Sequence, residues 1–111
     1  MVHQMKVANE VFKKFDLGEK VFESRLYDEK RQLINLGDEI IFTCNSDSKK
    51  VLKAKVKGLV RYSTFEELFT LHNPKFFGGK NIESLLKEIK QFYSDDQQKE
   101  YGVLGIHLQF D

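Results

Sequence analysis

Three charged side chains lie close together in the segment GEKVFESRL, residues 18–26, where their types and spacing are suited to chemistry. They are Lys20, Glu23 and Arg25, and apolar residues lie between and beside them. Residues two apart on an extended strand point to the same face, so Glu23 and Arg25 are expected to form an ion pair. Lys20 has the opposite parity and joins them only if the chain bends as it leaves Gly18.

This charged group has two interpretations. In the first it is an ion pair on the solvent-exposed face of a strand, which contributes about 0.5 kcal/mol to stability and has no other role. In the second it lines a cleft, where Lys20 and Arg25 bind a phosphate or a polarised carbonyl while Glu23 moves protons or holds a base edge. Residue types alone favour the exposed pair.

A second candidate is the basic segment VLKAKVKGLVRYS, residues 51–63. Its lysines alternate with apolar residues, which is typical of a half-buried strand with one face toward water. As a solvated face the lysines need no function, and they discourage aggregation at a sheet edge. As a track for phosphates they would give weak, salt-sensitive binding. The basic residues concerned are Lys53, Lys55 and Lys57, with Lys49, Lys50 and Arg61 nearby.

Aromatic side chains form a third group of candidates. Phe76 and Phe77 stand beside a Gly-Gly pair in HNPKFFGGK, a loop whose glycines would let it close over a ligand. These rings, together with Tyr62 and Tyr27, would stack on the exposed bases of single-stranded RNA. The alternative is that the loop simply packs down on the sheet.

The remaining reactive residues predict no cofactor and no metal site. Cys44 is the only cysteine, so it excludes an internal disulfide, and we interpret it as small packing volume. His3, His72 and His107 lie on different predicted elements without the spacing of metal ligands. His107 alternates with apolar neighbours and is interpreted as a residue on one face of the last strand.

Composition places these residues on one folded domain. The chain has 111 residues, of which 41% are hydrophobic and 32% charged, as expected for a single soluble globular domain spanning 1–111. No apolar run approaches the roughly 18–20 residues that span a membrane, and the start of the sequence has no signal-peptide core, so a cytoplasmic location is expected. The net charge is only +1, so a nucleic-acid binder would have to segregate its charges.

Hydrophobic periodicity predicts the elements that position the candidates. A helix over 8–18 is expected to be capped by Asn9, and a helix over 81–94 by Asn81, with Phe92 on its buried face. A shorter helix follows Ser63 or Thr64. The segments 45–50 and 94–100 are predicted to be a hairpin loop and a polar linker. Strands are expected over 2–8, 20–28, 39–44, 51–63 and 101–110, the last of them central in a curved or barrel-like mixed sheet.

Three motifs in this order resemble the ASCH family, a branch of the PUA-like β-barrels. The first is G-x-K-x-x-E-x-R, which reads here as residues 18–25. The second is the strand start G-D-x-I-x-F at 37–42, and the third is Y-G-V-L at 101–104. The match covers almost the whole chain. The resemblance implies an α+β fold, a PUA-like mixed β-barrel with flanking helices.

The resemblance also implies functions. PUA-like domains commonly bind RNA, and in related domains the first motif lines a ligand cleft that the start of the last strand approaches, so Tyr101 is expected near it. Some small bacterial ASCH proteins are amidohydrolases that deacetylate acetylated cytidine, with an active site similar to a Lys, a Thr three residues later and a distant Glu. Lys20 matches the lysine. Glu23 stands in place of the threonine, and residues 77–79, which align with the glutamate, have no carboxylate.

The sequence therefore predicts an RNA- or nucleotide-binding domain. Its ligand residues are expected to include Arg25, Tyr101, Phe76, Phe77, Lys53, Lys55 and Lys57. The alternative is an amidohydrolase in which Lys20 and Glu23 are catalytic; Glu66, Glu67 or Glu83 close to Lys20 would favour it. A third hypothesis is a protein-interaction module, which predicts an exposed apolar patch in place of a charged cleft. No membrane or metal partner is expected, and the ligand and the oligomeric state stay open.

Overall fold

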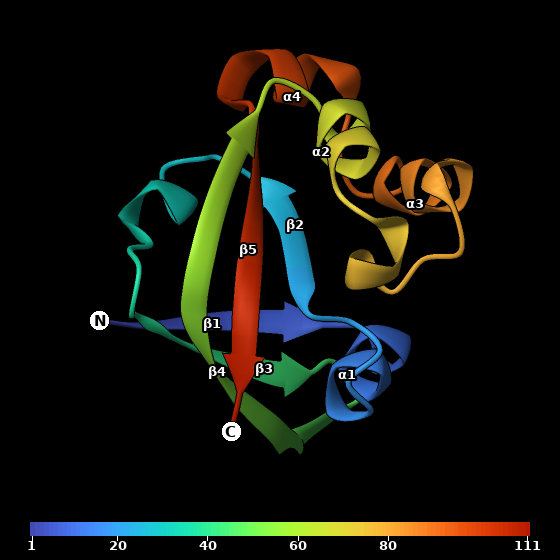
Figure 1. Cartoon of the computed structure of the whole chain (residues 1–111). Helices are drawn as coiled ribbons and strands as arrows, with labels where there is room; N and C mark the ends of the chain where they lie inside the picture. The colour runs from blue at the N-terminus through green and yellow to red at the C-terminus, as the bar shows by residue number, and fades with distance from the viewer.

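The computed structural model describes all residues, 1–111, and is of the α+β class, as predicted (Figure 1). The strands are β1 (Val2–Val7), β2 (Phe22–Leu26), β3 (Glu39–Cys44), β4 (Asp47–Tyr62) and β5 (Val103–Phe110). The helices are α1 (Asn9–Asp16), α2 (Phe65–Leu71), α3 (Ile82–Ile89) and α4 (Asp95–Tyr101), with 3-10 turns η1 (Arg31–Leu33) and η2 (Pro74–Phe77). None of the helices has the length and apolar character needed to cross a membrane.

The strands form one curled sheet in the order β1-β3-β4-β5-β2. The β1–β3 pair is parallel and the other three pairs are antiparallel. The long strand β4 pairs with β3 along its first half and with β5 along its second, so the sheet curls into a half-barrel. The internal position predicted for the last strand is confirmed. The two edges, β1 and β2, are not paired with each other.

Two apolar clusters hold the sheet in this shape. The first fills the inside of the half-barrel and includes Ile40, Phe42 and Ile106, all fully buried. The second lies between the outer face of the sheet and helices α2 and α3. There α2 packs directly on β5, because a Cβ at Gly105 would lie only 2.8 Å from Leu68 Cδ1. The helices are therefore fixed on one face, beside the edge strand β2.

The predicted polar linker 94–100 is wrong, since this segment forms α4. Its first turn carries a capping box, in which the Ser94 side chain accepts a hydrogen bond from the Gln97 main chain and the Gln97 side chain accepts one from the Ser94 main chain. Only Gln98 is buried, and its Oε1 accepts a hydrogen bond from Phe65 N at 3.0 Å. The helix thus has no apolar stripe, and its periodicity is invisible to a hydrophobic pattern.

Other predicted boundaries also differ. Asn9 is inside α1, not its cap, and its side chain instead accepts a hydrogen bond from Cys44 Sγ at 3.6 Å. Asn81 does cap α3, but that helix ends at Ile89, and Phe92 is 65% exposed instead of buried. The hairpin loop is shorter than predicted, because β4 already begins at Asp47.

Asp38, in the motif that starts β3, ties this strand to β1. Its carboxylate accepts a hydrogen bond from Asn35 N at 2.9 Å and lies 2.8 Å from His3 Nε2. The contact with His3, the hydrogen bond from Asn35 and the chain's terminal ammonium lower the pKa of Asp38 to about 2. The folded-state pKa lies below the unfolded value, so this carboxylate stabilises the fold above the unfolded pKa, and the stabilisation is lost as the pH falls through the folded pKa.

We therefore expect Asp38→Asn to reduce the dependence of the unfolding free energy on pH between about pH 4 and pH 2. Urea unfolding measured across this window checks the prediction. Asp16→Asn is the matched control, because Asp16 is exposed at the end of α1. An unchanged pH slope in Asp38→Asn would contradict the assignment.

Candidate functional site

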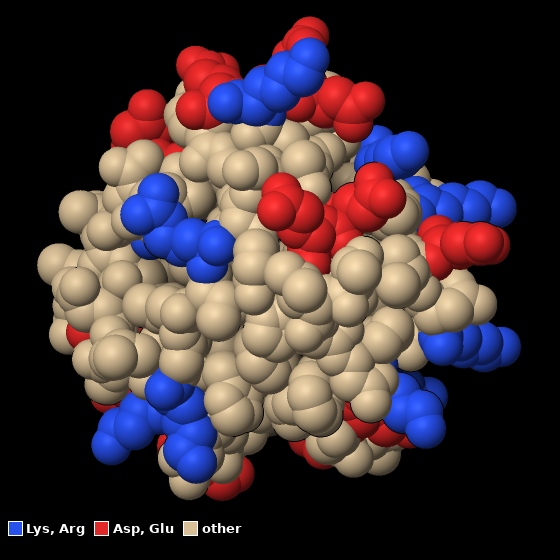
Figure 2. Space-filling model, turned by 45° about the horizontal axis from the view of Figure 1, so that its top comes forward, with Lys and Arg blue, Asp and Glu red and all other residues tan.

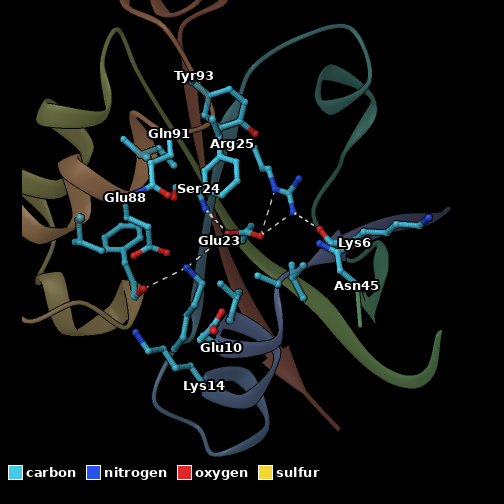
Figure 3. Close-up of a pocket in the computed structure, with 18 of the residues that line it drawn as sticks. Lys6, Glu10, Lys14, Glu23, Ser24, Arg25, Asn45, Glu88, Gln91 and Tyr93 are labelled. Atoms are coloured by element: carbon cyan, nitrogen blue, oxygen red, sulfur yellow. Dashed lines mark hydrogen bonds and ion pairs between the residues drawn. The ribbon is translucent and has the colours of Figure 1, made fainter. Parts of the chain in front are cut away.

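A cavity of about 510 Å³ lies where the half-barrel stays open, between β1 and β2 (Figure 3). Residues of β1 and α1 form one wall, β2 and the residues just before it form the floor, and residues of α2, η2, α3 and the segment after α3 form the other wall. The lining residues are Lys6, Val7, Ala8, Glu10, Val11, Lys14, Lys20, Glu23, Ser24, Arg25, Asn45, Phe69, Phe77, Leu85, Glu88, Ile89, Gln91, Phe92 and Tyr93.

Main-chain groups of both edge strands that have no partner within the sheet face this opening. On β1 the carbonyls of Met1 and Val7 accept hydrogen bonds from the β3 side, and because alternate residues point to opposite sides, Lys6 points its main-chain groups away from β3. By the same alternation, Ser24 points its main-chain groups away from β5. Arg25 spans the gap, since its Nη2 donates to the Lys6 carbonyl at 3.2 Å.

The Glu23 carboxylate is the centre of the predicted charged group, and its side chain is almost fully buried. Its Oε1 accepts a hydrogen bond from Ser24 N at 3.0 Å and lies 3.5 Å from Lys20 Nζ. Its Oε2 accepts two hydrogen bonds from Arg25, from Nε at 3.3 Å and from Nη2 at 3.0 Å. Both carboxylate oxygens therefore face two donors each, all supplied by the protein.

These contacts fix the charges of the group. Burial alone raises the pKa of Glu23, but the positive charges of Arg25 and Lys20 and the hydrogen bond from Ser24 together outweigh it, so the pKa is lowered. Burial alone lowers the pKa of Arg25, but Glu23 and Tyr93 outweigh it, so that pKa is raised. Glu23 is thus a carboxylate and Arg25 a guanidinium at neutral pH.

The position of Lys20 depends on a bend of the chain after Gly18, the condition under which Lys20 was expected to join Glu23 and Arg25. Gly18 has a φ of 74°, which favours glycine, and Lys20 N donates to the carbonyl of Lys14. Strand β2 begins only at Phe22, so strand parity does not apply to Lys20. Its Nζ can therefore turn toward Glu23 and also donate to the Phe77 carbonyl at 3.2 Å.

The loop that carries Phe76 and Phe77 is held at three consecutive carbonyls. Val21 N donates to the Phe76 carbonyl at 2.9 Å, Lys20 Nζ to the next carbonyl, and Lys14 Nζ to the Gly78 carbonyl at 2.8 Å. With the loop so held, both rings lie against Phe22, but they differ in burial. Phe77 is buried and lines the cavity, whereas Phe76 is 44% exposed and stacks on Phe22 outside it.

Of the predicted site residues, the structure brings Lys20, Glu23, Arg25 and Phe77 together in this cavity. Tyr101 lines a separate cavity of about 310 Å³ with Arg61 and Tyr62, and the nearby charge of Glu100 raises its pKa. The Arg61 guanidinium lies over the ring of Tyr27, 3.8 Å from its centroid. The three lysines of the basic strand, Lys53, Lys55 and Lys57, are exposed on β4 and line neither cavity.

Several cavity residues had no signal in the sequence. The carboxylates that enter are Glu10 from α1 and Glu88 from α3, not the three considered from the sequence, Glu66, Glu67 and Glu83 (Figure 3). Neither Glu10 nor Glu88 forms an ion pair. Tyr93 follows α3, and Figure 3 shows it beside Arg25. Each of these residues reaches the cavity only through the packing of its helix, which a local pattern does not encode.

Cys44 lies outside the cavity lining. It is buried, and its Sγ is 3.2 Å from Ser46 Oγ. The hydrogen bond with Ser46 lowers the pKa of the Cys44 thiol. Its burial fits the interpretation as packing volume.

Surface charge is mixed on the face that Figure 2 presents, where the end carrying α4 is turned forward. Acidic and basic side chains alternate over this face, and no single basic patch covers it. This face therefore offers a polyanion no continuous basic surface.

Comparison with known proteins finds a matching family and solved structures with the same fold. A model of the ASCH domain matches residues 5–110. The crystal structure of hypothetical protein PH0355 has a TM-score of 0.88 and 38% identity, with 100% of both chains covered. The solution structure of protein PF0455 from Pyrococcus furiosus has a TM-score of 0.75 and 30% identity, covering 99% of this chain and 97% of that one.

A third structure shows the fold alone. It is the ASCH domain from Lactobacillus crispatus JV V101, with a TM-score of 0.72 and 13% identity, covering 98% of this chain and 79% of that one. No protein of curated function matches the chain. The expected α+β fold, a PUA-like mixed β-barrel with flanking helices, is confirmed, and the sheet forms an open half-barrel. By the match over residues 5–110, the chain belongs to the ASCH domain family.

Proposed function

We propose that the cavity between β1 and β2 binds an RNA nucleotide or a nucleotide-like ligand. The observation that carries this proposal is the state of Glu23, whose two oxygens face donors from Ser24, Lys20 and Arg25. A carboxylate so fully occupied and ionised is poorly placed to move protons. It is well placed to hold two cations in fixed positions, and such preorganised donors recognise polar ligand groups.

The walls of the cavity supply the rest of a base-binding site. Its volume of about 510 Å³ lies in the range of small-ligand sites, roughly 300–1,000 Å³. Phe69, Phe77 and Tyr93 offer aromatic surface to a flat base. The Lys6 carbonyl and the Ser24 N–H are bonded to Arg25 and Glu23, so the Lys6 N–H and the Ser24 carbonyl are the main-chain groups left to offer hydrogen bonds to its edge. We assign Lys20 and Arg25 to the polar groups of the ligand, with Glu23 as their positioning residue.

Deacetylation of a modified cytidine is the competing function. It needs a group that activates water or attacks the acetyl carbon. Two of the three Lys20 Nζ donors are directed at the Phe77 carbonyl and at Glu23, which leaves one for a ligand. The other two carboxylates of the cavity, Glu10 and Glu88, make no hydrogen bond to Lys20 that would activate it. Binding therefore has more support than hydrolysis, and both are measured in one experiment.

The experiment is a panel of the common ribonucleosides, their monophosphates, acetylated cytidine and a short oligoribonucleotide, measured by calorimetry and by product analysis. Lys20→Met, which keeps the length of the side chain but removes its charge, is expected to weaken binding about tenfold or more. Lys13→Met is the matched control, because Lys13 is exposed on α1 and does not line the cavity.

Each outcome separates the candidates. Binding without turnover that is lost in Lys20→Met and kept in Lys13→Met supports the proposal. Release of acetate that depends on Lys20 would replace it with hydrolysis. Equal affinity of both variants for every ligand, or no binding of any ligand by the wild type, would overturn it. Circular dichroism of each variant shows that the fold is retained before affinities are compared.

A further inference from the structure

The outer face of the sheet carries a ladder of flat rings. His107 on β5 pairs across the strands with Phe22 on β2, and their ring centroids are 4.8 Å apart with planes only 3° apart. Phe76 on η2 continues the series, 5.8 Å from Phe22 with planes 21° apart. We call His107, Phe22 and Phe76 the ring ladder. Figure 1 shows β4, β5, β2 and the segment after α2 following one another across the view.

The ring ladder lacks a rung on β4. The residue that pairs with His107 there is Gly58, which has no side chain. Apart from its chain neighbours, only two atoms lie within 4 Å of a Cβ built at Gly58, namely His107 Cβ at 3.3 Å and His107 Nδ1 at 3.9 Å. Neighbouring strands are about 4.8 Å apart, so the open position beside the imidazole has the width of one flat ring stacked on it. We call this open position beside His107 the Gly58 slot.

Lysines flank the Gly58 slot on the same strand. Lys57 lies at the register shift between Val56 and Gly58, and Lys55 pairs with Gln109, two residues after His107. Both lysines and the next one, Lys53, are exposed. The one carboxylate paired beside them is Glu39 on β3, opposite Lys55. The surface beside the slot is therefore mainly positive, which complements a phosphate backbone.

We propose that this outer face binds single-stranded nucleic acid, with one base in the Gly58 slot stacked on His107 and the adjacent phosphates paired with Lys55 and Lys57. Stacking on an aromatic face is the usual way in which proteins hold unpaired bases, and a lysine row beside it adds salt-dependent affinity. A duplex hides its base faces and cannot occupy the slot. Phe22, Gly58 and His107 do not line the cavity, so this site goes beyond the proposed function.

The test uses fluorescence anisotropy with a labelled oligouridylate and the full-length chain. Gly58→Val fills the slot. The φ of Gly58 is not in the left-handed region, so a strand residue such as valine has no backbone strain there, and its Cβ, 3.3 Å from His107 Cβ, requires that side chain to shift by a few tenths of an ångström. We expect the affinity for the oligonucleotide to fall about tenfold, while the melting temperature does not decrease. Gly58→Ala adds only a Cβ and is the matched control, with a smaller loss. His107→Ala removes the stacking face and is expected to match Gly58→Val.

Charge is tested separately. Replacing Lys53, Lys55 and Lys57 together by glutamine is expected to reduce the slope of log affinity against log salt by about 2 for a single strand. Any one of three results would overturn the proposal. They are unchanged binding by Gly58→Val and His107→Ala, equal competition by a duplex, and no binding of the oligouridylate by the wild type at low salt. Gly58→Val should bind the nucleoside panel as the wild type does. Lys20→Met should bind the oligouridylate on the outer face with wild-type affinity. The two variants therefore distinguish failure of one proposed site from failure of the other.

Discussion

Glu23→Gln is expected to lower the free energy of unfolding by about 3 kcal/mol at neutral pH, because it removes one partner of a buried ion network. Glu23 is 6% exposed and Lys20 7% exposed, so water can replace little of the lost interaction between the carboxylate and its cationic partners. Glutamine keeps an oxygen that can accept from Ser24 N, but its amide group is itself a donor and faces a cation. The buried Lys20 and the half-buried Arg25 are then left as two positive charges near each other.

The same substitution should alter the response to acid. The folded-state pKa of Glu23 is lowered, so its carboxylate stabilises the fold above the unfolded value of about 4.3, and this contribution is lost as the pH falls through the folded pKa. The difference between wild type and Glu23→Gln is therefore largest at neutral pH and shrinks in acid. Urea unfolding at several pH values measures it.

Glu88→Gln is the matched control for this result. It makes the same chemical change in the same cavity, but Glu88 is exposed and has no ion pair. We expect its unfolding free energy to stay within about 0.5 kcal/mol of the wild type. Equal effects of the two substitutions would show that Glu23 has no special structural role.

Arg25→Lys is expected to have the second large effect, although the charge is kept. The guanidinium donates twice to Glu23 and once to the carbonyl of Lys6, so it joins β2 to β1 across the open side of the half-barrel. An ammonium lacks the planar fork needed for all three bonds. We expect a loss of about 2 kcal/mol in the free energy of unfolding and a tenfold or greater loss of ligand affinity in the cavity.

Arg61→Lys is the control for Arg25→Lys. Arg61 is exposed, stacks on Tyr27 and lies outside the main cavity. Its substitution should change neither cavity binding nor the stability by more than about 0.5 kcal/mol. Thermal unfolding and calorimetry of both variants measure the two effects. Wild-type affinity in Arg25→Lys would show that the cross-strand contact does not shape the site.

Much of the fold was predictable because the strands carry strong local patterns. The alternation in residues 51–63 predicts the part of β4 that exposes lysines and buries Ala54 and Val56. By contrast, α4 was missed because a polar helix held by one buried glutamine has no hydrophobic period. Asn9 was assigned as a cap from its residue type, but the helix starts one residue earlier and its side chain contacts Cys44.

The site was predictable only in its local part. Glu23 and Arg25 are two apart on a strand, so their pairing follows from the sequence. The other wall of the cavity comes from α3 and the segment after it, whose distance in sequence gives no hint of contact; Glu88 and Tyr93 were therefore invisible. The adjacent rings Phe76 and Phe77 also looked equivalent in the sequence, yet in the held loop only Phe77 is buried and lines the cavity.

The central claim is that the opening between β1 and β2 is the ligand site, and an amide NMR titration tests it most directly. Isotope-labelled protein is titrated with the tightest ligand of the nucleoside and nucleotide panel. We predict that the largest shifts fall on the amides of Lys6, Ser24, Arg25 and Tyr93, which border the cavity. Shifts concentrated around Arg61, Tyr62 and Tyr101 instead would place the ligand in the smaller cavity and contradict the account.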